Sequence, residues 1–126
     1  MATPLEVVSQ FIDTWPSGDA HALAAFFTED AVYHNIPVDP VVGRDAIESM
    51  ISWFTEGVDK VEFEVRHAVA DGPVVMTERI DRFFRPAGVI ALPVMGIFEV
   101  QADGLISGWR DYFDLNQFMT QLGEQG

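Results

Sequence analysis

Two short segments of this chain place carboxylates among apolar residues, Thr77 to Asp81 and Trp109 to Tyr112. Both segments are predicted to be β-strands, in which successive side chains point to opposite faces. In the first segment, Arg79 and Asp81 share one strand face with apolar neighbours. In the second segment, Asp111 also shares its face with apolar residues. An ionised carboxylate on a core-facing surface is costly unless it is paired or protonated. Two such carboxylates with an arginine available to bridge them predict an acid/base site.

Two carboxyl groups linked by a guanidinium can act on one substrate if one stays protonated near neutral pH and the other stays charged. Apolar surroundings raise the pKa of a carboxyl, whereas a neighbouring arginine lowers it. The protonated group donates to a leaving oxygen, and the ionised group takes a proton from water. Tyr33 and Asn35 are two residues apart on a predicted strand, so both can orient that water from one face. These groups fit the addition of water to a neutral, strained electrophile.

The composition indicates one folded domain over residues 1–126, because hydrophobic residues make up 48% of the chain and aromatic residues 12%. The absence of cysteine excludes disulfides, a thiol nucleophile and thiolate metal sites. A net charge of −13 opposes binding to nucleic acid or anionic membranes, and we interpret it as a contribution to solubility. We find no secretion signal and no apolar run of the roughly 20 residues that span a bilayer. We therefore expect a cytoplasmic protein with a neutral ligand.

The first half of the chain is predicted to be mainly helical. The expected elements are a helix from Pro4 to Trp15, a short helix capped by Asp19 that carries Leu23, Phe26 and Phe27, a strand from Ala31 to Asn35, a loop from Pro37 to Gly43 and a helix from Arg44 to about Glu56.

The second half alternates with period two and is predicted to form strands. The expected elements are strands over residues 60–69, 74–85, 89–100 and 105–114, followed by a short helix from about Asn116. Residues 89–100 are apolar on both faces, so we expect both faces to be covered. Pro93 cannot donate to a sheet, which predicts a bulge or an edge there. The fold class is therefore α+β, with about three N-terminal helices on one side of a strongly curved, mostly antiparallel sheet and a short C-terminal helix.

The order and spacing of three motifs resemble the limonene-1,2-epoxide hydrolase family, whose members are small enzymes of the cone-shaped NTF2-like (SnoaL-like) superfold. The motifs are Tyr33-x-Asn35, Thr77-Glu78-Arg79-x-Asp81 and the segment from Gly108 to Asp114. The resemblance implies that Asp81 is the acid that protonates the epoxide, Asp111 the base that activates water, and Arg79 the bridge between them. It implies that Tyr33 and Asn35 position the water, that no cofactor or metal takes part, and that the protein is a homodimer.

The substrate implied is a small, neutral, hydrophobic epoxide, cyclic or aryl, which is opened by water in one step to a vicinal trans-diol. The walls of its pocket are expected to be apolar, because general acids work better where water is excluded. The side chains that we assign to these walls are Phe83, Leu92, Val94, Phe113, Trp15, Ile12 and Phe54. Ala91, Met95 and Ile97, on the opposite face of their strand, are candidates for contact with a second subunit.

Two other functions remain open on the sequence. A ketosteroid-isomerase-like or cyclase-like proton shuttle fits the same superfold, but it has no need of an arginine between two aspartates. A non-catalytic ligand-binding module has no reason to keep two carboxylates on apolar faces. The three histidines show no metal-ligand spacing, and His67, on the apolar face of its strand, is expected to be a core residue.

Overall fold

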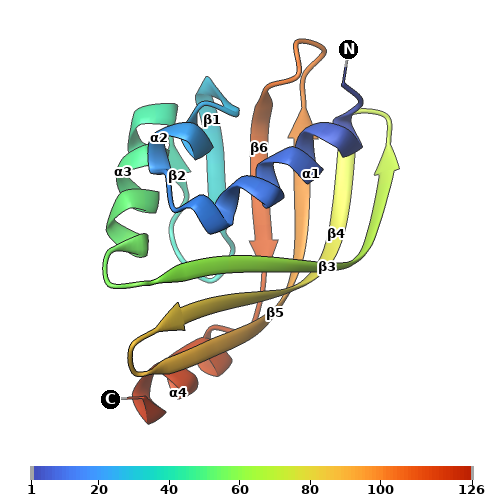
Figure 1. The fold of residues 1–126 in the computed structure, drawn as a ribbon. Helices are drawn as coiled ribbons and strands as arrows, with labels where there is room; N and C mark the ends of the chain where they lie inside the picture. The colour runs from blue at the N-terminus through green and yellow to red at the C-terminus, as the bar shows by residue number, and fades with distance from the viewer. Residues whose placement is uncertain (1, 126) are drawn as a thin grey trace.

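The computed structural model describes residues 2–125 as four α-helices, a short 3-10 helix and one six-stranded sheet (Figure 1). The elements are α1 (Pro4–Thr14), η1 (Trp15–Ser17), α2 (Ala20–Ala24), β1 (Phe27–Asn35), β2 (Val41–Val42), α3 (Arg44–Thr55), β3 (Lys60–Asp71), β4 (Val74–Arg85), β5 (Gly88–Val100), β6 (Ile106–Tyr112) and α4 (Leu115–Glu124).

Local sequence signals set the helix boundaries as predicted in the N-terminal part. Thr3 and Glu6 form a capping box at the start of α1, which satisfies backbone N–H groups that have no partner within the helix. Gly18, at φ 68°, ends η1 in the left-handed conformation that glycine tolerates, and Asp19 caps α2. The second helix is shorter than predicted. Phe27 lies in β1, because pairing with Ile106 of β6 extends that strand toward the N-terminus.

The sheet has the strand order β2-β1-β6-β5-β4-β3, and its pairs are antiparallel except for β1 with β6. The sheet is strongly curved and open, α1 lies across one of its faces, and α2 and α3 lie beside β1 (Figure 1). The α+β class, the curved and mostly antiparallel sheet and the C-terminal helix are therefore confirmed. This order brings β4 and β6, which carry the two aspartates, to either side of β5.

Pro93 lies at a free edge of β5, as one of the two predicted alternatives has it. Pairing of β5 with β4 continues through Pro93 without a register shift, so there is no bulge at this point. Pairing with β6 begins only at Met95, two residues later. The edge is partly covered by α4, whose Gln121 side chain accepts from the N–H of Ala91 at 2.9 Å and donates to its carbonyl at 2.8 Å.

The prediction that His67 is a core residue is wrong. Its side chain is 81% exposed, and Nδ1 lies 2.7 Å from Oε1 of Glu78. A register shift in β3 between Val65 and His67 breaks the simple alternation on which the prediction rested. Residues 64–71 of β3 are all exposed, since this edge strand extends beyond the core.

Along β5, only one face of the sheet is covered. Burial alternates along that strand: Ile90, Leu92, Val94 and Phe98 are buried, and Met95 is 52% exposed. The expected cover for the second face is not provided by residues 2–125. On the covered face, the ring of Phe11 on α1 is fully buried and makes edge contacts with five aromatic rings, including that of Trp109 at 5.1 Å.

None of the helices within residues 2–125 combines the length and the apolar character needed to cross a membrane. The cytoplasmic location stays a prediction.

Candidate active site

The side chain of Arg79 bridges the two aspartates in the interior of the protein. Its Nε and Nη2 donate to the two carboxylate oxygens of Asp81 at 2.9 and 2.8 Å. The same Nη2 donates to Oδ2 of Asp111 at 2.9 Å. The guanidinium is fully buried, and each carboxylate side chain is only 4% exposed. The structure thus brings together the three groups that strand parity placed on core-facing surfaces.

The bridge spans three strands because the middle strand has no side chain at the crossing point. Gly96 of β5 is paired with Thr77 of β4 on one side and with Asp111 of β6 on the other. A Cβ atom at Gly96 would overlap Nη1 of Arg79 and lie 2.5 Å from Oδ1 of Asp111. The absence of this atom leaves room for Nη1 of Arg79 to donate to Thr77 Oγ1 at 3.0 Å. Gly96 therefore makes the site possible, although sequence reasoning did not single it out.

The charge balance of the site favours one retained proton. One buried guanidinium can neutralise one carboxylate, and a second ionised carboxylate would add an uncompensated charge in a poorly solvated place. Burial, and to a smaller extent the charge of Asp111, raise the pKa of Asp81 to about 6 against the opposing effect of Arg79. Asp81 is the group that the structure favours as the proton holder.

Arg79 itself stays charged. Burial disfavours the cation, but the charges and hydrogen bonds of Asp111 and Asp81 outweigh that effect and raise the pKa of Arg79 above its ordinary value. The guanidinium carbon also lies 4.8 Å from the centre of the Phe63 ring, a distance at which a cation is attracted to an aromatic face.

Asp111 accepts a second hydrogen bond, from Trp109, which the sequence placed only on the same strand face. Nε1 of Trp109 donates to Oδ1 of Asp111 at 2.7 Å, while Arg79 holds the other oxygen. Trp109 and Asp111 are two residues apart on β6, so their side chains share a face. This spacing was the only signal of their contact in the sequence. Hydrogen bonds to both oxygens fix the orientation of the Asp111 carboxylate.

Tyr33 and Asn35 lie beside Asp111, because β1 pairs with β6 in a register that places Asn35 next to Asp111 and Tyr33 next to Trp109. The ring of Tyr33 stacks on that of Trp109 at 4.1 Å, and its hydroxyl donates to Oδ1 of Asn35 at 3.2 Å. Burial, and next the charge of Asp111, raise the pKa of Tyr33 above its ordinary value. The hydroxyl therefore remains a neutral hydrogen-bond donor.

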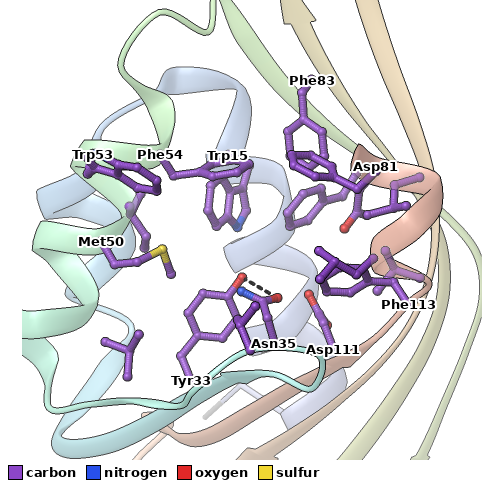
Figure 2. Close-up of a pocket in the computed structure, with 18 of the residues that line it drawn as sticks. Trp15, Tyr33, Asn35, Met50, Trp53, Phe54, Asp81, Phe83, Asp111 and Phe113 are labelled. Carbon is purple, nitrogen blue, oxygen red and sulfur yellow. Dashed lines mark hydrogen bonds between the residues drawn. The ribbon is translucent and has the colours of Figure 1, made fainter. Parts of the chain in front are cut away.

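A cavity of about 270 Å³ opens onto these groups. Figure 2 shows the carboxyl groups of Asp81 and Asp111 and the Tyr33–Asn35 pair directed into it. Arg79 is not part of the lining, since it lies behind the two carboxylates. The predicted wall residues that do line the cavity are Phe83, Leu92, Val94, Phe113, Trp15 and Phe54.

Ile12 was predicted to line the cavity, but it does not. It belongs to the buried stripe of α1 that packs into the hydrophobic core. Helical spacing placed it on the inner face but could not show which part of the interior that face meets. Met50 and Trp53 of α3 and Phe118 of α4 also line the cavity, although they were not predicted to do so.

No group of three His, Cys, Asp or Glu side chains within residues 2–125 is arranged to hold a metal ion. The chemistry that the described side chains supply is acid/base: a buried carboxyl with a raised pKa, a second buried carboxyl held by two donors, and two polar groups beside it in an apolar cavity.

Comparison with known proteins gives one family match over nearly the whole chain. The family model of the limonene-1,2-epoxide hydrolase catalytic domain matches residues 2–123. Epoxide hydrolase EphG of Mycobacterium tuberculosis is 32% identical over 117 residues, which cover 91% of this chain and 76% of EphG.

Solved structures share the fold. The structure of an LEH-like epoxide hydrolase of M. tuberculosis is 28% identical, with a TM-score of 0.84 over 97% of this chain and 90% of that chain. A SnoaL-like protein from Shewanella denitrificans has a TM-score of 0.87 over 96% of this chain and 97% of its own, at 17% identity. The latter similarity shows the fold alone, and it confirms the SnoaL-like superfold.

We predict that Gly96→Ala destabilises the protein by about 3 kcal/mol, because the new methyl group overfills the site and displaces a buried ion pair. Chemical denaturation with urea measures this change. Gly123→Ala is the matched control, since a Cβ at this position of α4 meets no atom within 4 Å and alanine favours helices. Equal stability changes in the two variants would show that the space at Gly96 does not matter.

Proposed function

The chain belongs to the limonene-1,2-epoxide hydrolase family, and we propose that it hydrolyses hydrophobic cyclic or aryl epoxides to vicinal trans-diols by one-step attack of water. The observation that carries this proposal is the Arg79 bridge between two buried carboxyl groups at the wall of an apolar cavity. The relative EphG is an epoxide hydrolase, which supports the same class of reaction.

In the proposed reaction, Asp81 is the general acid. Each of its oxygens accepts one hydrogen bond from Arg79 and keeps a lone pair that can carry the proton. The raised pKa of Asp81 keeps a fraction of the molecules protonated near neutral pH. The proton passes to the epoxide oxygen as the carbon–oxygen bond breaks, so the leaving oxygen becomes a hydroxyl group.

Asp111 is the proposed general base. A water molecule held by Tyr33 and Asn35 gives one proton to Asp111 while its oxygen forms a bond to the epoxide carbon. The charges balance: Asp81 loses a proton, Asp111 gains one, and Arg79 stays bonded to both carboxyl groups throughout. Attack from the side opposite the leaving oxygen inverts that carbon and gives the trans-diol.

The cavity supports a compact apolar substrate. Its volume of about 270 Å³ is near the lower end of the range for small-molecule sites. Apart from the acid/base groups, most of the side chains around it are apolar, including Phe54, Leu92 and Val94. The net charge of −13 disfavours anionic substrates. These properties support neutral cyclic or aryl epoxides as the substrate class.

A proton shuttle is the alternative function, because the fold of this chain is also found in a Catenulispora acidiphila protein with a ketosteroid isomerase-like fold, at 21% identity. A shuttle needs one base and one donor to an oxyanion. A guanidinium between two carboxylates adds nothing to that chemistry, so the site favours hydrolysis. Incubation with a β,γ-unsaturated ketosteroid, followed by absorbance of the conjugated product, tests the alternative directly.

We also propose that the protein is a homodimer that uses the outer face of β4, β5 and β6. Met76, Met95 and Tyr112 are about half exposed there, and Met95 and Tyr112 are neighbours in the register of β5 and β6. Large apolar side chains that gather on one face of a sheet are typical of protein interfaces.

We predict that Asp81→Asn and Asp111→Asn each lower kcat/KM by a factor of about 10² to 10⁴, because each variant removes a general acid or base. The substrates to test are limonene oxide, cyclohexene oxide and styrene oxide, with the diols resolved by chiral chromatography. Asp114→Asn, an exposed N-cap of α4 where asparagine also caps well, is the matched control. Full turnover in a folded Asp111→Asn variant would remove the base from this mechanism.

A single turnover in ¹⁸O-labelled water is part of the same test. Direct attack of water places the label in the first diol formed, whereas an ester between an aspartate and the substrate would give an unlabelled first product.

We predict that kcat/KM falls as the pH rises through about 6, because Asp81 must be protonated to act as the acid and its pKa is raised to about this value. Above that pH the rate constant is expected to decrease about tenfold for each pH unit. The profile is measured from pH 5 to 9, with subtraction of the uncatalysed opening. A flat profile up to pH 9 would contradict the role of Asp81.

For the dimer, we predict that Met95→Lys shifts the protein toward monomers, because a buried unpaired ammonium opposes association. Light scattering coupled to size-exclusion chromatography reports the mass. Val42→Lys is the control, since Val42 is 62% exposed on β2, at the other end of the sheet. A monomeric unmodified protein, or a dimer that Met95→Lys leaves intact, would rule out this interface.

A further inference from the structure

Trp15 has a buried hydrogen-bond donor without a partner. Its indole is 3% exposed, and among residues 2–125 its Nε1 is the one buried side-chain nitrogen or oxygen that no protein group satisfies. The other two tryptophans differ: Nε1 of Trp109 donates to Asp111, and Trp53 is 73% exposed. A buried donor without an acceptor is destabilising and calls for an explanation.

The position of the indole is fixed by aromatic contacts. Trp15 begins η1, directly after α1, and its ring packs on Phe63 at 4.9 Å and against Phe11 at 6.0 Å. Phe63 is in turn the β3 neighbour of Asp81 in the sheet. Trp15 is therefore held on the side of the cavity where the acid lies.

The nitrogen edge of the ring is directed into the cavity. Figure 2 shows Nε1 of Trp15 pointing toward the space between Asp81 and the Tyr33–Asn35 pair. Since no protein atom among residues 2–125 accepts from it, a molecule that occupies this space can supply the acceptor.

We propose that the Trp15 indole N–H donates a hydrogen bond to the oxygen of the bound epoxide, as a second donor beside Asp81. This inference rests on the proposed function and adds a residue to it. An ether oxygen has two lone pairs, so it can accept the proton of Asp81 and the indole N–H together. A bond to the attacking water would instead make that water a poorer nucleophile, and Tyr33 and Asn35 already lie next to the base.

A donor at this position assists the reaction and does more than bind the substrate. Negative charge develops on the epoxide oxygen as its bond to carbon breaks, and the hydrogen bond strengthens in step with that charge. The indole N–H does not titrate in the ordinary pH range, so its contribution is independent of pH.

The first test observes the hydrogen bond without any reaction. The chain has three tryptophans, so the protein labelled with ¹⁵N-tryptophan gives three indole N–H signals in an NMR spectrum. Trp15→Phe and Trp53→Phe assign them. The ligands are 7-oxanorbornane, a cyclic ether that water does not open under these conditions, and norbornane, the hydrocarbon of the same shape.

We expect the ether, but not the hydrocarbon, to move the Trp15 proton signal downfield. Equal shifts with both ligands, or no shift with either up to the solubility limit, would overturn the inference. The experiment needs no turnover, so it separates this inference from the proposed function: a protein that hydrolyses the epoxides without the ether-specific shift refutes only the role of Trp15. An ether-specific shift without hydrolysis refutes only the proposed reaction.

The second test is kinetic. We expect Trp15→Phe, which keeps an aromatic ring but lacks the donor, to lower kcat by about 10- to 100-fold with the pH dependence unchanged. An increase in KM at constant kcat would show that Trp15 acts only through packing, and would overturn the inference. Should Trp15→Phe not fold, the Trp53→Phe variant and the hydrogen-bonded shift of Trp109 still leave the Trp15 signal assigned, so the NMR result decides.

Discussion

The buried guanidinium of Arg79 is the group on which the rest of the site depends. A cation without any solvent exposure must be compensated by nearby anions, and Asp81 and Asp111 provide this compensation at 2.8 to 2.9 Å. The same cation cannot balance both carboxylates, so the trio is electrically neutral only when one proton stays bound. The same three side chains thus neutralise a buried arginine and, in the proposed reaction, supply an acid and a base at one pH.

Enclosing this charge constrains the surrounding structure. The guanidinium reaches from β4 to β6 only because β5 has Gly96 at the crossing point. Aromatic rings cover the rest: Phe63 lies over the guanidinium, and Trp109 donates to Asp111 while its ring stacks with Tyr33. Each of these neighbours excludes water and at the same time fixes the direction of a polar group, so the packing of the core also sets the electrostatics of the site.

Several parts of the site were predictable from sequence because strand periodicity is local. Side chains two residues apart in a strand share a face, and this rule alone brought Arg79 next to Asp81. The same rule failed for His67, where a register shift and the end of the core changed the outcome. Helical spacing likewise could not separate the cavity wall from the core, and for this reason Ile12 was assigned to the cavity although it packs in the hydrophobic core.

The sequence by itself determined most of the elements, most strand faces and a set of two carboxyl groups with an arginine between them, because these follow from spacing and side-chain chemistry. Only the tertiary structure decided which strands are neighbours, and therefore that Gly96 leaves space for the bridge and that β1 places Tyr33 and Asn35 beside Asp111. It also decided that the indole N–H of Trp15 lacks a protein acceptor. The physical reason is that pKa values and unpaired donors depend on burial and on charges from distant parts of the chain, which no local pattern specifies.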